Sequence, residues 1–160
     1  MAELKGINKL LTLCTDFINE IDDFEDVQLD TDFCCFPETK EIFVSVIAIE
    51  DALCEFMENL LERTTVNDIS EFTWSLLHEV GHCETEYILS KRTNNHCKYE
   101  KRKIAKGKQP TKNYYHLTDE KMATNWAIKF VEHNYDFVKN FDTKILKFLK
   151  KFAIDNNIEM

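Results

Sequence analysis

Glycine and proline are scarce in this chain, which has Gly 3 and Pro 2 in 160 residues. Turn-rich β architectures need more of both, so the scarcity favours long helices. Long apolar runs are also missing, because the longest, from Ile42 to Ile49, contains Ser45 and is too short to cross a bilayer. The N-terminal residues show no signal-peptide pattern. These absences predict a soluble cytoplasmic protein that contacts no membrane.

The charge balance and the cysteine pattern exclude two further classes. A net charge of −9 argues against a protein that binds nucleic acid directly through its overall charge. The six cysteines include no C-x-x-C pair, so they are expected to be buried thiols of a reducing compartment, with a cysteine-built zinc site as an alternative. A chain of 160 residues that is 44% hydrophobic can bury one sizeable core, which predicts a single domain over residues 1–160.

Hydrophobic periodicity predicts a mostly helical α+β fold. Apolar residues at spacings of three and four predict helices over residues 2–20, 50–63, 68–89, 118–140 and 142–154. Alternating residues predict a strand over 27–36, and a turn at Pro37 makes residues 41–48 its antiparallel partner. Asn67, Thr118 and Asp142 are the predicted N-caps of the last three helices. The result is a small antiparallel sheet beside the helix at 68–89.

The helix predicted at 68–89 contains the segment His78–His82, which reads His-Glu-Val-Gly-His. Two histidines four positions apart lie on one side of a helix and can hold a single zinc ion. Glu79 is offset by about 100° from His78, so its carboxylate could take a proton from a zinc-bound water. An apolar stripe opposite the histidines is expected to face the core; it consists of Phe72, Leu76, Val80, Cys83 and Tyr87.

Two observations bear on whether this motif is functional. The alternative is that it arose by chance, with both histidines on a solvated surface, but a chance match need not fall in an amphipathic helix. Gly81 costs about 1 kcal/mol of helix propensity relative to Ala. Its presence therefore predicts that another backbone or a substrate passes close to this side of the helix.

Residues 91–112 form a strongly basic segment. Nine of the 20 basic residues fall here against one acidic residue, Glu100. Gly107 and Pro110 interrupt the segment, which predicts a long basic loop outside the core. The loop is either ordinary solvated surface or a lid or docking segment for an acidic partner.

A catalytic zinc site needs a third protein ligand and an open fourth position for water. The residues after His82 do not supply a third histidine at the metzincin spacing. Glu120 is the best source, because it begins a predicted helix in which Ala123 and Ala127 would permit close packing. Asp119 and His116 are the alternatives for this third ligand.

These residues carry a family resemblance. His78–His82, followed after the basic segment by Glu120-x-x-Ala123-x-x-Trp126-Ala127, resembles the ImmA/IrrE family of zinc metallopeptidases over about residues 40–130. The resemblance implies a zincin-like domain with one zinc ion per chain, held by His78, His82 and Glu120, and with Glu79 as general base. It also implies a protein or peptide substrate, with a transcriptional repressor of a phage or mobile element as a candidate.

The implied chemistry is zinc-assisted peptide hydrolysis, in which Glu79 takes the proton of the attacking water and passes it to the leaving amine. Tyr114, Tyr115 or His116 could donate a hydrogen bond to the oxyanion, or could simply pack. The strand from Ile42 to Val46 is expected to form the edge of the cleft and to bind an extended substrate. The alternative function is a zinc-stabilised interaction protein that captures a partner without cutting it.

Overall fold

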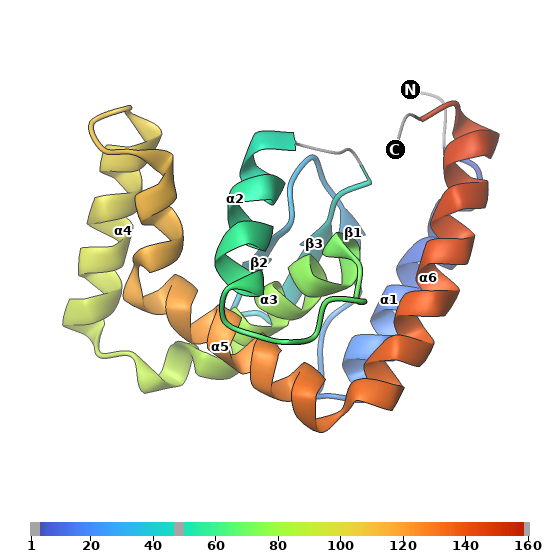
Figure 1. The fold of residues 1–160 in the computed structure, drawn as a ribbon, viewed down its shortest axis with the longest axis horizontal. Helices are drawn as coiled ribbons and strands as arrows, with labels where there is room; N and C mark the ends of the chain where they lie inside the picture. The colour runs from blue at the N-terminus through green and yellow to red at the C-terminus, as the bar shows by residue number, and fades with distance from the viewer. Residues whose placement is uncertain (1–3, 47–49, 159–160) are drawn as a thin grey trace.

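The computed structural model describes residues 4–46 and 50–158, with side chains described outside residues 50–54. The elements in chain order are α1 (Ile7–Asn19), β1 (Gln28–Leu29), β2 (Cys34–Phe36), β3 (Glu41–Val44), α2 (Glu50–Leu61), α3 (Glu71–Thr85), η1 (Glu86–Ile88), α4 (Lys91–Ala105), η2 (Thr111–His116), α5 (Thr118–His133) and α6 (Tyr135–Asn156) (Figure 1). The predicted mostly helical α+β fold is confirmed. No helix in the described ranges is both long enough and apolar enough to span a bilayer.

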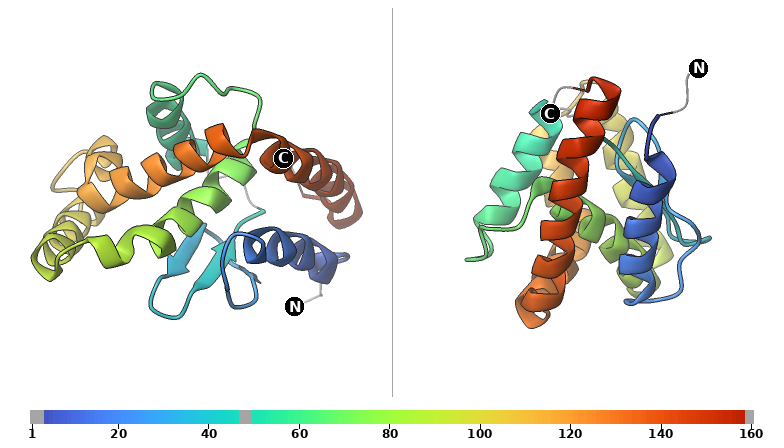
Figure 2. Two further views of the ribbon diagram at one scale, coloured as in Figure 1. Left: turned by 90° about the horizontal axis from the view of Figure 1, so that it is seen from below. Right: turned by 90° about the vertical axis from the view of Figure 1, so that its right-hand side faces the viewer.

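Helix α3 occupies the centre of the molecule. The sheet lies on one side of it and α5 on the other, while α1 and α6 run side by side at one end (Figure 2). The packing of α1 on α6 is apolar, because Phe17 stacks on Phe141 with ring centroids 3.9 Å apart. Leu76, Leu77 and Val80 of α3 are fully buried between the layers. Helix α3 is thus held on two sides, which fixes the positions of the motif residues.

The sheet is mixed rather than antiparallel, so the predicted continuous strand over 27–36 is wrong. Its strand order is β1-β3-β2, with β2 antiparallel and β1 parallel to the central β3. The chain bends between β1 and β2, where the Asp30 carboxylate accepts a hydrogen bond from the Thr31 amide at 2.7 Å. A local side-chain bond of this kind competes with the backbone hydrogen bonds that would continue the strand. The predicted antiparallel pairing across the Pro37 turn is confirmed; residues 47 and 48 of the predicted second strand lie outside the described residues.

The predicted N-caps are wrong. Helix α3 starts after Ser70 instead of Asn67, and the Ser70 hydroxyl accepts from the Thr73 amide at 3.3 Å. Leu117, not Thr118, precedes α5. Asp142 lies inside α6, where it is fully buried and accepts hydrogen bonds from the Ser70 amide and the Thr73 hydroxyl. Asp142 therefore supports the start of α3 through tertiary contacts and does not cap its own helix.

The predicted boundaries at the C-terminal end also shift. Helix α5 ends at His133 and α6 begins at Tyr135, so the break falls at Asn134 and not near residue 141. Both the amide and the side chain of Asn134 donate to the Phe130 carbonyl, at 2.9 and 3.0 Å, which ends α5 at this residue. The predicted apolar stripe of α3 holds through Cys83, but Tyr87 belongs to η1 and is 84% exposed.

The predicted basic loop at 91–112 is wrong, because most of it is helix α4. Ser90 caps the helix by accepting from the Thr93 amide at 3.1 Å, and Lys and Arg are good helix formers. Cys97 and Ile104 are buried and anchor its inner side. Gly107 ends it with φ 72°, a left-handed conformation that favours glycine.

Exposed basic side chains on α4 and in the turn that follows it form what we call the basic face. Its members are all exposed: Lys91, Arg92, Lys98, Arg102, Lys106 and Lys108. The ion pairs that α4 makes with described residues come from other side chains, namely Lys101 and Lys103. Helix α4 with its basic face lies at one extremity of the molecule, opposite α1 and α6 (Figure 1).

Gly81 confirms the expected close approach of another backbone. A Cβ built on it would lie 2.4 Å from the Ala123 carbonyl oxygen of α5. Ala123 and Ala127, which face α3, are fully buried. The absence of a side chain at residue 81 therefore sets the distance between the helix that carries the histidines and the helix that carries Glu120.

Gly81→Ala is expected to destabilise the protein by about 1–3 kcal/mol, the range for overpacking, although Ala is the better helix former. The added methyl group must push α5 away from α3, and Glu120 moves with α5. Chemical denaturation and zinc titration measure the two effects. Gly107→Ala is the control, because its Cβ meets open space and only its positive φ is strained. Unchanged stability and zinc affinity in Gly81→Ala would contradict this account.

Candidate metal centre

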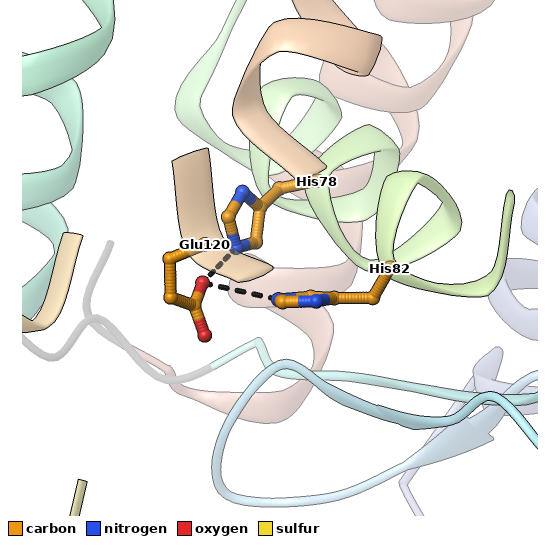
Figure 3. Close-up of side chains that lie close together, drawn as sticks. All are labelled: His78, His82 and Glu120. Atoms are coloured by element: carbon orange, nitrogen blue, oxygen red, sulfur yellow. Dashed lines mark hydrogen bonds and ion pairs between the residues drawn. The ribbon is translucent and has the colours of Figure 1, made fainter. Parts of the chain in front are cut away.

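Three side chains from two helices converge on one point. His78 and His82 come from α3, and Glu120 comes from the first turn of α5 (Figure 3). The Glu120 Oε2 atom lies 2.6 Å from His78 Nε2 and 3.0 Å from His82 Nε2. The ligand atoms of all three residues lie within 4.8 Å of one another. The structure thus brings together the three residues that the sequence predicts as metal ligands.

The geometry and the donor types fit a divalent metal ion such as zinc. Ligand atoms about 2.0–2.1 Å from a tetrahedral ion stand roughly 3.3 Å apart. The oxygen–nitrogen distances at Glu120, 2.6 and 3.0 Å, are about 0.7 and 0.3 Å shorter than this, so an outward movement of the ligands by that much would make room. Two imidazoles and a carboxylate are a donor set found in catalytic zinc sites. The cluster could therefore hold a metal ion.

Thr124 orients one of the histidines. The Nδ1 atom of His78 lies 3.0 Å from the Thr124 hydroxyl, and both side chains are buried. When Nδ1–H donates to this oxygen, the lone pair of Nε2 points toward Glu120 and is available to a metal ion. Thr124 lies one turn after Glu120 on α5, so the same helix face supplies a ligand and the support of another.

Electrostatics hold the cluster in its charged form. Burial alone would lower the pKa of His82, but the adjacent Glu120 carboxylate outweighs burial and raises that pKa to about 9. Burial would likewise raise the pKa of Glu120, whereas the two histidines hold it well below its usual value. Without a metal, the site is therefore an ion pair of protonated imidazole and carboxylate. A metal ion that binds His82 must displace the proton.

Lys101 is a member of the site that sequence reasoning missed. Its ammonium lies 2.8 Å from Glu120 Oε1 and 2.6 Å from Asp119 Oδ2. Burial lowers the pKa of Lys101, but Glu120 and Asp119 outweigh this and raise it. A signal was available, because Lys101 falls four residues after Cys97 and three before Ile104, on the buried side of α4.

A cavity of about 480 Å³ opens beside the cluster. Glu79, His82 and Glu120 line one wall, together with Tyr114 and Lys101. Strand β2 and the turn that follows it also line the cavity, with residues 33–39. Glu79 is half-buried and shares the cavity with two members of the cluster, as a base for a metal-bound water requires.

The three candidate oxyanion donors occupy different places. Tyr114 lines the cavity, and burial together with the Glu120 carboxylate raises its pKa, so its hydroxyl stays protonated. Tyr115 packs against the Phe56 ring, with centroids 5.7 Å apart, at the edge of the core. His116 is exposed. Of the three predicted oxyanion donors, only Tyr114 is among the described residues that line the cavity.

The strand at the edge of the cavity is not the one that the sequence predicts. Strand β3, which contains Ile42, is the centre of the sheet and is paired on both sides. Strand β2 is an outer strand, and Cys34, Cys35 and Phe36 on it line the cavity. The predicted edge from Ile42 to Val46 is therefore wrong, and β2 takes its place.

Comparison of the chain with protein-family models, curated proteins and solved structures gave no match in any of the three. The assignment of chemistry therefore depends on the residues of the site itself.

Proposed function

We propose that this protein is a zinc-dependent peptidase in which His78, His82 and Glu120 hold one zinc ion. The observation that carries the proposal is the arrangement of the cluster against the cavity. Three ligands converge, and a separate carboxylate, Glu79, faces the same space. A structural zinc site closes its fourth position with another protein ligand and needs no base. Three ligands beside a cavity and a carboxylate favour catalysis.

Each residue then has a defined task. A bound zinc ion would polarise the scissile carbonyl and lower the pKa of a bound water toward neutrality. Glu79 takes the proton of the attacking water and passes it to the leaving amine. Tyr114, protonated and facing the cavity, donates a hydrogen bond to the oxyanion. Thr124 orients the His78 ring, and when its hydroxyl accepts from Nδ1–H it leaves Nε2 free for the metal ion.

The substrate is a polypeptide in extended conformation. The outer edge of β2 borders the cavity, so a peptide could add to the sheet there while its scissile bond lies over the cluster. Resemblance to the ImmA/IrrE family favours a protein substrate, with a repressor of a phage or mobile element as the candidate. Any effect on DNA would then be indirect, through the repressor.

The test is cleavage of a peptide library by the zinc-loaded protein, followed by mass spectrometry. We expect a set of fragments that shares a sequence preference. Cleavage should stop on addition of a chelator such as 1,10-phenanthroline and return when zinc is restored. Cleavage that continues in chelator, or a protein that binds zinc and leaves every peptide intact at high enzyme concentration, contradicts the proposal.

The basic face of α4 is where we expect an acidic partner or an acidic part of the substrate to dock. Replacing Lys91, Arg92, Lys98 and Arg102 by Gln should weaken binding of a labelled octaglutamate peptide and flatten its salt dependence, because exposed charges are screened over about 10 Å at 0.1 M salt. Fluorescence anisotropy across a salt titration measures both effects.

The matched control removes the same number of charges from α6. Its exposed lysines are Lys144, Lys147, Lys150 and Lys151. Replacing these four by Gln should leave peptide binding near that of the parent. Equal losses in the two variants would show a general charge effect and return the basic face to ordinary solvated surface.

A further inference from the structure

We propose that Lys101 is a positioning residue that leaves Glu120 only one oxygen for the metal ion. The inference depends on the metal-binding half of the proposed function and is independent of whether the protein cleaves peptides. It gives helix α4 a role in the chemistry of a centre whose ligands all come from α3 and α5.

The two oxygens of Glu120 have different neighbours. Oε2 faces His78 Nε2 at 2.6 Å and His82 Nε2 at 3.0 Å, so it is the atom that points into the cluster. Oε1 faces Lys101 Nζ at 2.8 Å. Glu120 is 1% exposed, so water has little access to replace the ammonium. To bind a metal ion through both oxygens, Glu120 would have to give up a charge-assisted hydrogen bond in a buried place.

Lys101 is itself held in position. Asp119 Oδ2 accepts from its ammonium at 2.6 Å, and the ammonium lies 5.0 Å from the centre of the Tyr114 ring. The other oxygen of Asp119 accepts from the Glu120 amide at 2.8 Å, so Asp119 is fixed at the start of α5. Lys101 therefore cannot follow Glu120 freely, and the carboxylate is oriented by a rigid neighbour.

The number of oxygens that Glu120 offers decides whether the site can react. With one carboxylate oxygen and two imidazoles, a zinc ion has three protein ligands and keeps a position for water. With both oxygens bound, this position is filled or crowded. Carboxylates bind metal ions in both modes, so a neighbour that occupies one oxygen can set the choice, and Lys101 is placed to do so at Oε1.

This role predicts an unusual response to mutation. Loss of an ordinary supporting residue around a metal site weakens metal affinity by about 10–100-fold. Loss of Lys101 should instead leave zinc affinity equal to that of the parent or tighter, because the carboxylate gains a second bonding oxygen and a positive charge near the ion disappears. The coordination number should rise at the same time.

Cobalt(II) is the probe of coordination, because its visible absorption is intense in four-coordinate sites and weaker in five-coordinate ones. We expect cobalt-loaded Lys101→Met to lose visible intensity relative to the parent, and Lys101→Arg, which keeps a cation for Oε1, to recover it. Zinc affinity is measured in parallel by competition with a chromophoric chelator. Lys112→Met is the control, because Lys112 is exposed and lies outside the lining of the cavity.

Two results overturn the inference: an unchanged cobalt spectrum in Lys101→Met, or zinc binding weakened 10–100-fold as for an ordinary supporting residue. If Lys101→Met does not fold, Asp119→Asn provides the same test, since it loosens the hold on Lys101 and should shift the spectrum in the same direction. A parent that binds no metal ion overturns both this inference and the proposed function. A parent that binds zinc but cleaves no peptide overturns only the proposed function.

Discussion

Glu79→Gln is expected to bind zinc like the parent and to lose about 10²–10⁴-fold in the rate of peptide cleavage, the usual contribution of a general base. The substitution keeps the shape of the side chain and the helix around it but cannot accept the proton of the attacking water. Glu79 lines the cavity and is outside the cluster that would hold the ion, so the change should spare the metal centre. Zinc content and unfolding temperature should match those of the parent.

The matched control for Glu79→Gln is Glu86→Gln. Glu86 lines the same cavity and loses the same charge, but it lies two turns further along, outside α3. Cleavage by this variant should remain close to that of the parent.

Where a substrate is not in hand, a cellular phenotype gives the readout. A phenotype that survives in Glu79→Gln but is lost in His78→Ala would exclude a peptidase and leave a zinc-dependent interaction protein.

The metal cluster could be predicted because it depends on short spacings within helices. His78 and His82 lie one turn apart in any helix that contains them, so their direction follows from sequence alone. Gly81 predicted a close backbone, and Ala123 with Ala127 showed where one could approach. The sequence did not show that these two features belong to one contact, and the structure joins them at Gly81 and Ala123, some forty positions apart.

The predictions that failed depended on tertiary partners. Asp142 follows every local rule for an N-cap, yet it is buried inside α6 and accepts from Ser70 and Thr73. No local pattern shows that the start of α3 lies within reach of this carboxylate. The break between β1 and β2 is a similar case. Strand β1 pairs in parallel with β3, a strand further along the chain, and this pairing forms only in the folded protein.

Helix α4 was not predicted because its high charge obscured its helical pattern. Nine basic residues interrupted by Gly107 and Pro110 suggested a loop, although Lys and Arg are good helix formers and the real ends of the helix are marked by Ser90 and Gly107. The residue that matters most on it, Lys101, was grouped with its exposed neighbours. Its placement between Cys97 and Ile104 on the buried side is the pattern that separates a site residue from surface charge.

Removal of a ligand from the cluster should abolish stoichiometric zinc binding, and this is the second large effect that we expect. The parent should bind one zinc ion per chain, whereas His82→Ala and Glu120→Ala should each bind none at micromolar concentrations, because two remaining ligands make a weak site. Metal analysis after gel filtration gives the stoichiometry. His96→Ala is the control, since His96 is exposed on α4 and its loss removes one imidazole without touching the cluster.

The same variants should separate metal binding from folding. Zinc that binds only the folded chain stabilises it by about 2.7 kcal/mol at a free concentration of 100 Kd, so the unfolding temperature of the parent and of His96→Ala should rise with zinc. The unfolding temperature of His82→Ala should not change when zinc is added. Glu120→Ala removes the carboxylate that pairs with both His82 and Lys101, so it should also be less stable than the parent before zinc is added. If Glu120→Ala retains one zinc ion and still responds to it, the third ligand is a different residue, with Asp119 the nearest candidate, and the assignment of Glu120 fails.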